Sequence, residues 1–163
     1  ISKENRKCFM NTNHIQGDSK STISYALIYE GEPCAVMSFS INGDCSYILD
    51  RFATSRPVIG GFTKLLTYFN KKFNYPKIIT FADLRYSSGD LYINSGFKLD
   101  GTIKPDYYWV NNGIRYHKFN FRHKMMKKKL KVYDASLSEA DNMQNNGYYK
   151  IYDAGKLRFT TND

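Results

Sequence analysis

The sequence predicts a mixed α/β (α+β) domain followed by a small basic appendage. Hairpin patterns precede and follow a central strand–helix–strand–helix–strand stretch, an order typical of a mixed sheet. The composition then changes after Phe121, where a basic segment begins. We therefore expect one domain over residues 1–121 and an appendage over residues 122–163, made of a basic helix, a short helix and a hairpin.

The first third of the chain predicts a helix followed by three strands. Residues 3–13 are expected to form the helix, with Cys8 and Phe9 directed inward. Apolar and polar residues alternate over residues 23–30 and 34–41, which predicts a hairpin. A turn signal at Asn42-Gly43-Asp44 then leads to a strand over residues 45–53.

The middle of the chain is predicted around a turn that joins an apolar strand to a helix. Pro57 suits the start of the turn, and two glycines lead into the helix. Apolar residues recur at helical spacing from Phe62 to Phe73. A nearly continuous apolar run over residues 77–83 predicts a strand that is covered on both faces. A short helix over residues 89–95 and a strand from Phe97 follow.

The last third predicts a second hairpin and the appendage. Residues 107–110 and 114–121 flank Asn111-Asn112-Gly113, a strong turn signal. Residues 122–130 are expected to be a basic helix. Asp134 or Ser136 is expected to cap a helix over residues 137–145. Residues 148–152 and 156–160 are expected to pair as a small hairpin.

Composition and charge narrow the classes of function. The net charge is +9, from 24 basic and 15 acidic residues, which favours polyanionic partners. Eight lysines and arginines and no acidic residue occur between Arg115 and Lys131. There is no apolar run long enough for a membrane helix and no secretory segment. The three cysteines have no metal-type spacing, so no metal site is expected. They are expected to be reduced, buried thiols, which, with the lack of a membrane helix or secretory segment, predicts a cytoplasmic protein.

The glycine turn is the first candidate site. A helix that begins at Gly60 and Gly61 points its first N–H groups at whatever lies over the turn, and such an end attracts phosphate or another anion. A plain strand–helix turn is an equal alternative. The residues expected to contact a bound cofactor are Arg56, Val58, Ile59, Gly60, Gly61, Phe62, Thr63 and Lys64.

Three further clusters are candidates for chemistry or binding. Asp83 ends the buried strand, where open α/β sheets bind ligands, although helix capping or an ion pair with Arg85 or Arg51 is an equal alternative. Tyr92 is able to donate a proton, although a helical tyrosine is more often part of the core. Aromatic residues around Tyr108 are interleaved with cations, a pattern suited to nucleic-acid contacts, but about half of them must face the core. The expected DNA-binding residues are Arg115, His117, Lys118, Arg122, Lys124, Lys127, Lys128 and Lys129.

The central stretch resembles the GNAT acetyltransferases. Their turn pattern, Arg/Gln-x-x-Gly-x-Gly/Ala, matches here at Arg56 and Gly61, whereas Ile59 stands where the pattern has its first glycine. Residues 91–97, Leu-Tyr-Ile-Asn-Ser-Gly-Phe, resemble a second family pattern whose tyrosine acts as a general acid. The resemblance implies a mixed, mostly antiparallel sheet flanked by helices, acetyl-CoA on the turn, and a catalytic role for Tyr92.

A second resemblance covers nearly the whole chain. Strings such as Val58-Ile59-Gly60-Gly61-Phe62-Thr63-Lys64-Leu65 resemble the C-terminal region of phage homing-endonuclease-like proteins, and the central stretch is similar to phage Mom-type DNA-modification proteins. No nuclease centre is visible in this chain. The Mom-type likeness implies that Asp83 is an acidic site residue, with Arg51 as its basic counterpart.

These observations leave three hypotheses. The first is a DNA-binding GNAT-fold domain of a phage protein that acts on double-stranded DNA. The second is an acyl-CoA-dependent enzyme that modifies a DNA base, adenine, with catalytic residues Asp83, Tyr92, Arg51 and Tyr108. The third is an ordinary GNAT N-acetyltransferase. The expected partners are accordingly DNA and acetyl-CoA.

Overall fold

The computed structural model describes residues 1–43 and 46–161, and the chain divides into two compact units. Unit 1 comprises Ile1–Thr102 and the segment that begins at Leu157. Unit 2 comprises Ile103–Lys156 and is inserted in the chain between strands β5 (Lys98–Ile103) and β9 (Lys156–Thr160). This division differs from the boundary expected after residue 121. The reason is that the second hairpin shares a hydrophobic core with the helices that follow it.

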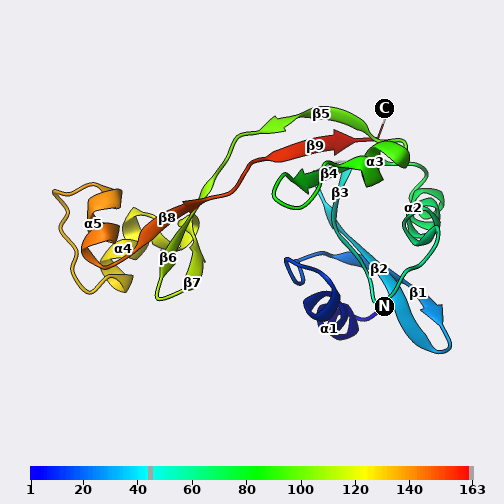
Figure 1. Cartoon of the computed structure of the whole chain (residues 1–163), viewed down its shortest axis with the longest axis horizontal. Coiled ribbons are helices and arrows are strands. Elements are labelled where there is room, and N and C mark those ends of the chain that lie inside the picture. The colour runs from blue at the N-terminus through cyan, green and yellow to red at the C-terminus, as the bar shows by residue number, and fades with distance from the viewer. Residues whose placement is uncertain (44–45, 162–163) are drawn as a thin grey trace. The chain divides into compact units, whose positions relative to one another are not determined.

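Unit 1 is built on a six-stranded sheet with the strand order β1-β2-β3-β4-β9-β5 (Figure 1). β1 (Ile23–Tyr29), β2 (Glu32–Ile41) and β3 (Ser46–Thr54) pair antiparallel in sequence, and β4 (Lys77–Asp83) pairs parallel with β3. The expected mixed, mostly antiparallel sheet is thus confirmed. Residues 156–160 lie in this sheet, so the hairpin expected between residues 148–152 and 156–160 is wrong.

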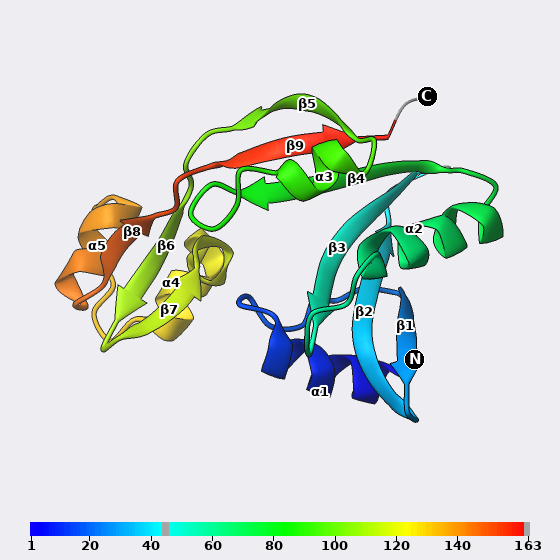
Figure 2. The same cartoon turned by 45° about the vertical axis from the view of Figure 1, so that its right-hand side comes forward.

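Two helices cover opposite faces of β2, and the alternation of that strand explains why. The side chains of Ala35, Met37 and Phe39 belong to the core that α2 (Gly61–Lys72) buries, and the rings of Phe39 and Phe69 stack at 3.7 Å. Val36, on the other face, packs with Met10 of α1 (Lys3–Asn13). Burial on both faces accounts for the unbroken run of buried residues from Cys34 to Phe39. Figure 2 shows the two helices on either side of the sheet.

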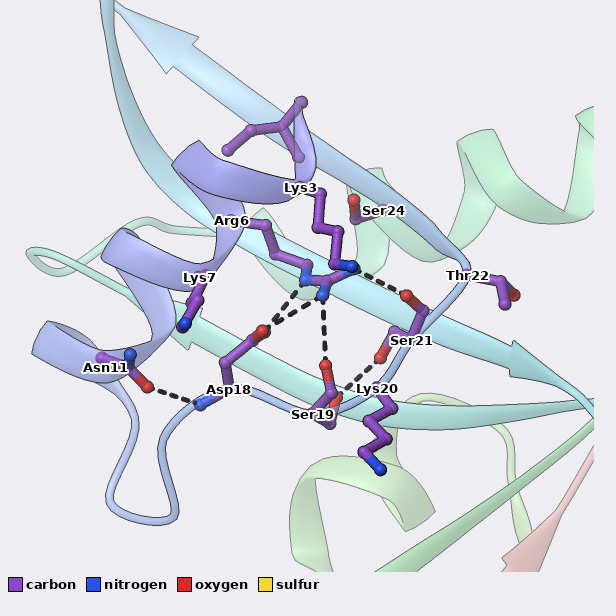
Figure 3. Close-up of a pocket in the computed structure, with 11 residues that line it drawn as sticks. Lys3, Arg6, Lys7, Asn11, Asp18, Ser19, Lys20, Ser21, Thr22 and Ser24 are labelled. Atoms are coloured by element: carbon purple, nitrogen blue, oxygen red, sulfur yellow. Dashed lines mark hydrogen bonds and ion pairs between the residues drawn. The ribbon is translucent and has the colours of Figure 1, made fainter.

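An ion pair ties the segment after α1 back to the helix (Figure 3). Arg6 is only 3% exposed, and its Nε donates to Asp18 Oδ1 at 2.9 Å. The same guanidinium donates to the carbonyl oxygens of Ser19 and Ser21. The expectation that Cys8 points inward is wrong, because Arg6 and Met10 occupy the buried face of α1 and Cys8 is exposed.

The other cysteines divide in the same way. Cys34 is buried, as expected, and its thiol lies 3.4 Å from the carbonyl oxygen of Leu27. Cys45 lies outside the described residues. Among the described residues, no helix combines the length and the apolar character needed to cross a membrane.

Unit 2 has its own sheet, its own helices and its own core. The sheet has the order β7-β6-β8, from β7 (Ile114–His117), β6 (Tyr107–Asn111) and β8 (Tyr149–Tyr152). The helices are the 3-10 helix η1 (Lys118–Phe121), α4 (His123–Lys129) and α5 (Glu139–Asn145). Trp109, Met126 and Met143 are buried together in one cluster, which holds the hairpin and the two α-helices in one unit.

Two local predictions in unit 2 are corrected by the side chains at the element ends. The strand expected to run to Phe121 stops at His117, because the His117 side chain accepts a hydrogen bond from Phe119 N and caps η1. Ser138, rather than Asp134 or Ser136, caps α5 by accepting from Asp141 N. A cap must lie immediately before the first helical turn, and the helix begins two residues later than the sequence predicted.

Candidate functional site

The site in unit 1 lies where two parallel strands part. The parallel register of β3 and β4 covers Ser46–Leu49 and Lys77–Thr80. Beyond Leu49 and Thr80, no further pairing joins the described residues of these two strands, and their ribbons diverge in Figure 2. Crevices at the carboxyl ends of strands in open α/β sheets are common ligand sites, because main-chain groups and side chains converge there.

A β-bulge in β3 helps to create this opening. Ser38 pairs with Arg51 and Phe39 pairs with Leu49, so Asp50 is an extra residue on β3. A bulge bends its strand and turns the neighbouring side chains toward new directions. As a result Asp50 and Arg51 both line the opening, and Phe52 returns to the α2 face, where its ring meets Phe62 at 5.1 Å.

A cavity of about 150 Å³ occupies the opening, and three of the four predicted catalytic residues line it. Arg51 comes from β3, Asp83 from the end of β4 and Tyr92 from α3 (Asp90–Asn94). The fourth, Tyr108, lies on β6 in unit 2. The cavity is also lined by residues that were not predicted as site residues: His14, Ile15, Gln16, Asp50, Phe52, Phe81, Ala82, Tyr86, Ser87 and Leu91.

Asp83 is buried and surrounded by hydrogen-bond donors. Arg85 donates to it from Nη2 at 2.7 Å, from Nε at 3.0 Å and from its backbone N–H at 3.1 Å. Gln16 Nε2 donates to Oδ2 at 3.1 Å. Four donors suit an ionised carboxylate that fixes its neighbours. The geometry therefore favours the ion-pair alternative, with Arg85 as the partner.

Arg51 and His14 also line the cavity. Arg51 donates from Nε to the carbonyl oxygen of Gly17 and from Nη1 to that of Asp50, which holds its guanidinium beside the cavity. Burial, and then the positive charge of Arg51, lower the pKa of His14 below its ordinary value. His14 Nδ1 accepts from the backbone N–H of Gln16, so the neutral ring carries its proton on Nε2.

Tyr92 lines the cavity, and its ring also packs against three phenylalanines of the core. Its ring packs against Phe159 at 5.4 Å, Phe97 at 5.8 Å and Phe62 at 6.1 Å. These contacts depend on Gly89, the residue before α3, because a Cβ at this position would lie 2.3 Å from Phe159. Tyr92 is therefore both a core residue, through its ring, and a lining residue of the cavity.

The glycine turn has the backbone that an anion site requires. Gly60 has φ of +69°, a left-handed conformation that favours glycine, and it immediately precedes α2. A Cβ on Gly60 would meet no heavy atom of the described residues within 4 Å, so the turn is open on that side. A Cβ on Gly61 would lie 3.0 Å from Val58, so this glycine is required by packing.

The residues predicted to contact a cofactor differ in exposure and in their neighbours. Ile59 is 98% exposed, whereas Phe62 is buried in the core and offers only its backbone. The Arg56 guanidinium lies 4.3 Å from the centre of the Tyr29 ring. Lys64 lines a separate hollow of about 710 Å³ beside β1, together with Tyr68. Thr63 is exposed in the first turn of α2.

The predicted DNA-binding residues all lie in unit 2. Lys118 is engaged, because its Nζ forms an ion pair with Asp106 at 2.6 Å, which lowers the pKa of that carboxyl group. Four lysines of α4 are exposed, whereas Met126 of the same helix is buried. These lysines are Lys124, Lys127, Lys128 and Lys129. Arg115, His117 and Arg122 are exposed in or next to the hairpin.

The fold is similar to that of solved N-acetyltransferases. The ribosomal-protein-S18-alanine N-acetyltransferase from Escherichia coli is 9% identical with a TM-score of 0.58, over 99% of this chain and 89% of that protein. A GNAT family acetyltransferase from Elizabethkingia anophelis, solved with acetyl-CoA bound, is 15% identical with a TM-score of 0.48, over 86% and 75%. An N-acetyltransferase from Staphylococcus aureus Mu50 is 17% identical with a TM-score of 0.42, over 50% and 63%.

These likenesses concern the fold. The matched region spans less than two thirds of the Staphylococcus aureus protein, at 63% of its length. The sequence matches no protein-family model and no curated protein. The likeness to the Escherichia coli enzyme, with its TM-score above 0.5, shows that the chain has a GNAT-like N-acetyltransferase fold, as the central motifs predicted. No comparison supports the expected relationship to phage homing-endonuclease-like or Mom-type proteins.

Proposed function

We propose that the protein is an acyl-CoA-dependent N-acetyltransferase that works in the cavity between β3 and β4. The observation that carries this proposal is the cavity itself. It lies where two parallel strands part, it is lined by Arg51, Asp83 and Tyr92, and β3 leads directly into the glycine turn. The fold shared with the Escherichia coli N-acetyltransferase supports the same class of reaction.

The glycine turn fits the pyrophosphate of acetyl-CoA. The first N–H groups of a helix have no partner within the helix and attract phosphate. The open side of Gly60 leaves these groups of α2 accessible, and no acidic side chain lies in the first turn. The Gly61 N–H already donates to the carbonyl oxygen of Val58 at 3.1 Å, so we assign this contact to the backbone of Gly60, Phe62 and Thr63. Acetyl-CoA would supply an acetyl group activated as a thioester.

The residues of the cavity fall into separate roles under this proposal. The phenol of Tyr92 holds a proton at Oη that a departing sulfur would take. Asp83 acts as a positioning residue, because its carboxylate holds Arg85 and Gln16 in place. The Asp50 carboxylate accepts hydrogen bonds from Ser21 and Ser40 through Oδ2, and it is the acceptor that we assign to the proton of an incoming amine.

The acceptor amine would enter beside α1. An open hollow of about 1030 Å³ lies between α1 and the segment that leads into β1 (Figure 3). Ser21 lines this hollow and donates to Asp50 Oδ2 at 2.6 Å, and Asp50 lines the cavity. No described residue lines both, so the Ser21–Asp50 hydrogen bond separates the hollow from the cavity, and an amine entering from the hollow would have to open it.

Release of free thiol from acetyl-CoA, measured with a panel of amines and peptide N-termini, tests the proposal. Tyr92→Phe keeps the ring contacts and removes the proton, so we expect kcat to fall by about 10²- to 10⁴-fold with little change in acetyl-CoA binding. Tyr86→Phe is the matched control, since Tyr86 lines the same cavity and is 52% exposed. Equal activity of the two variants would contradict the role given to Tyr92.

A second candidate function is binding of duplex DNA by unit 2. This unit has eleven lysines and arginines against five acidic residues, a surplus of six out of the chain's net charge of +9. On α4, Lys124, Lys127 and Lys128 recur at helical spacing on the side away from Met126. A row of cations of this kind suits a phosphate backbone.

The salt dependence of duplex binding tests this second candidate. Replacing the three α4 lysines by glutamine should reduce the slope of log K against log salt by about 2 to 3, because about 0.9 counterion is released per phosphate contact. Lys71 and Lys72 of α2, replaced in the same way, are the control. Asp83→Asn should leave DNA binding unchanged.

The Mom-type likeness has its own test. Under that hypothesis, mass spectrometry of nucleosides from DNA co-expressed with the protein would show a modified adenine.

A further inference from the structure

The register of the small sheet in unit 2 sorts its aromatic residues onto two faces. Neighbouring residues of a strand point to opposite faces, and residues paired across strands share a face. Trp109 is buried and pairs with Tyr116, which packs against the same core as Tyr107. Tyr108 is on the other face, where it pairs with His117 on one side and Ile151 on the other.

The outer face of this sheet is uncovered within unit 2. Tyr149 and Ile151 of β8 are 69% and 51% exposed, although both are large and apolar. Val110 lies on the same face between Tyr149 and Arg115, since it pairs with both residues. Exposed apolar side chains that gather on one face of a sheet indicate a binding surface more often than scattered ones do.

Cations lie over the aromatic rings of this face. The Arg115 guanidinium lies 4.6 Å from the centre of the Tyr108 ring, and the His117 ring meets the same tyrosine at 5.5 Å. The pattern continues into η1, where Phe119 is 53% exposed, lies 4.7 Å from His117 and carries the Arg122 guanidinium at 4.0 Å. We call these side chains the aromatic–cationic face: Tyr108, Arg115, His117, Phe119, Arg122 and Tyr149.

The two arginines of the aromatic–cationic face are available to an anion. Among the described residues, no carboxylate forms an ion pair with Arg115 or Arg122. Lys118, between them in sequence, differs because it is held by Asp106. The face therefore combines flat apolar surfaces with unneutralised positive charge, in a unit that has an excess of basic residues.

We propose that the aromatic–cationic face binds a single strand of DNA. Unpaired bases would stack on Tyr149, Tyr108 and Phe119, while Arg115 and Arg122 contact the phosphates between them. This combination of stacking surfaces and backbone cations is how single strands are bound without strong sequence preference. A duplex hides the base faces in its own stack, so it would use only the cations. Stacking and phosphate contacts need no 2′-hydroxyl, so binding of the DNA strand should not depend on the sugar.

Fluorescence anisotropy with a labelled twelve-residue oligothymidine and the full chain tests the proposal. Because the α4 lysines are a separate candidate for duplex binding, the face is tested through Tyr149, whose replacement should weaken the single strand and leave a duplex of the same length unchanged. Tyr149→Ala should weaken binding at least about fivefold, which is the low end for loss of one stacked base, and Tyr149→Phe should retain it. Tyr75→Ala is the matched control, because Tyr75 has the same 69% exposure and lies in unit 1.

The arginines and the sugar provide independent readouts. Arg115→Gln should lower the magnitude of the salt slope by about 0.7, the value for one phosphate of a single strand. An oligouridine should bind within about tenfold of oligothymidine. Equal weakening of single strand and duplex by Tyr149→Ala, or a tenfold preference for RNA, would overturn the proposal. Equal effects of Tyr149→Ala and Tyr75→Ala in variants with unchanged circular dichroism would overturn it as well.

Discussion

Gly89→Ala gives a sharp test of how α3 is held against the core. Gly89 has φ of +88°, and a Cβ there would lie 2.3 Å from Phe159 Cζ, so ring and backbone must separate by more than about 1 Å to reach ordinary contact. The left-handed backbone costs an alanine about 1–2 kcal/mol. The overpacking costs about 1–3 kcal/mol more. We expect the free energy of unfolding to fall by about 2–5 kcal/mol.

Gly96→Ala is the matched control for this experiment. Gly96 has nearly the same backbone, with φ of +87°, but a Cβ there would meet no heavy atom of the described residues within 4 Å. Its cost should therefore be the backbone term of about 1–2 kcal/mol alone. Urea unfolding followed by circular dichroism measures both variants, and fluorescence of Trp109, the single tryptophan, follows unit 2 separately. Equal losses for Gly89→Ala and Gly96→Ala would refute the packing argument.

Two further predictions concern pH. The NMR titration midpoint of His14 should lie below 6.5, because burial and then the charge of Arg51 lower its pKa, and Arg51→Met should raise the midpoint part of the way back. As the pH falls, the unfolded chain binds a proton at His14 at a higher pH than the folded chain does. The free energy of unfolding should therefore decrease as the pH falls below about 6.5. Burial opposes the ionisation of Asp18, but the hydrogen bonds and the positive charge of Arg6 outweigh burial and lower the pKa of the carboxyl group. The Arg6–Asp18 ion pair therefore stabilises the fold above about pH 3.9, the pKa of an unfolded aspartate. This stabilisation is lost as the pH falls through the lower pKa of the folded protein. Asp18→Asn should therefore cost about 1.5–3 kcal/mol at pH 7 and much less near pH 2, as measured by urea unfolding at the two values, and a constant difference would contradict this reasoning.

Local patterns were sufficient to predict most elements of unit 1. The helix over residues 3–13 and the strand over residues 77–83 were predicted with the bounds that the structure has. The turn at Gly60 and Gly61 was also predicted, because two adjacent glycines directly before an apolar helical repeat are typical of a turn that leads into a helix. The insertion of unit 2 was missed. Residues 156–160 look like a hairpin partner for residues 148–152, and only the pairing of distant strands reveals that they belong to the large sheet.

For the site too, the sequence did not reveal residues that are brought together only by contacts between distant segments. Arg51, Asp83 and Tyr92 were selected from the sequence, and the fold brings them to one cavity. His14, Gln16 and Asp50 were missed as site residues, because nothing in the sequence places the loop after α1 beside the end of β4. One signal was present for Asp50: the apolar repeat of Tyr47 and Leu49 resumes at Phe52 rather than at residue 51, which is the mark of a one-residue bulge.

The aromatic residues of unit 2 illustrate what register adds. The sequence indicated that about half of them face the core, but not which half. The pairing of Trp109 with Tyr116 and of Tyr108 with His117 decides it, and it leaves an exposed face of mixed aromatic and cationic character. A strand pattern in which nearly every residue is aromatic or polar carries no alternation from which this could be read.

Isothermal titration of acetyl-CoA into the protein and two Gly60 variants tests the proposed function most directly. Gly60→Asp adds a negative charge at the turn, where a side chain has room, and Gly60→Asn adds the same shape without the charge. Both residues tolerate a left-handed backbone. We predict that the wild type and Gly60→Asn bind acetyl-CoA and that Gly60→Asp binds at least about tenfold more weakly, a difference of about 1.4 kcal/mol. No binding to the wild type at millimolar acetyl-CoA, or equal affinities of the two variants, would contradict the account.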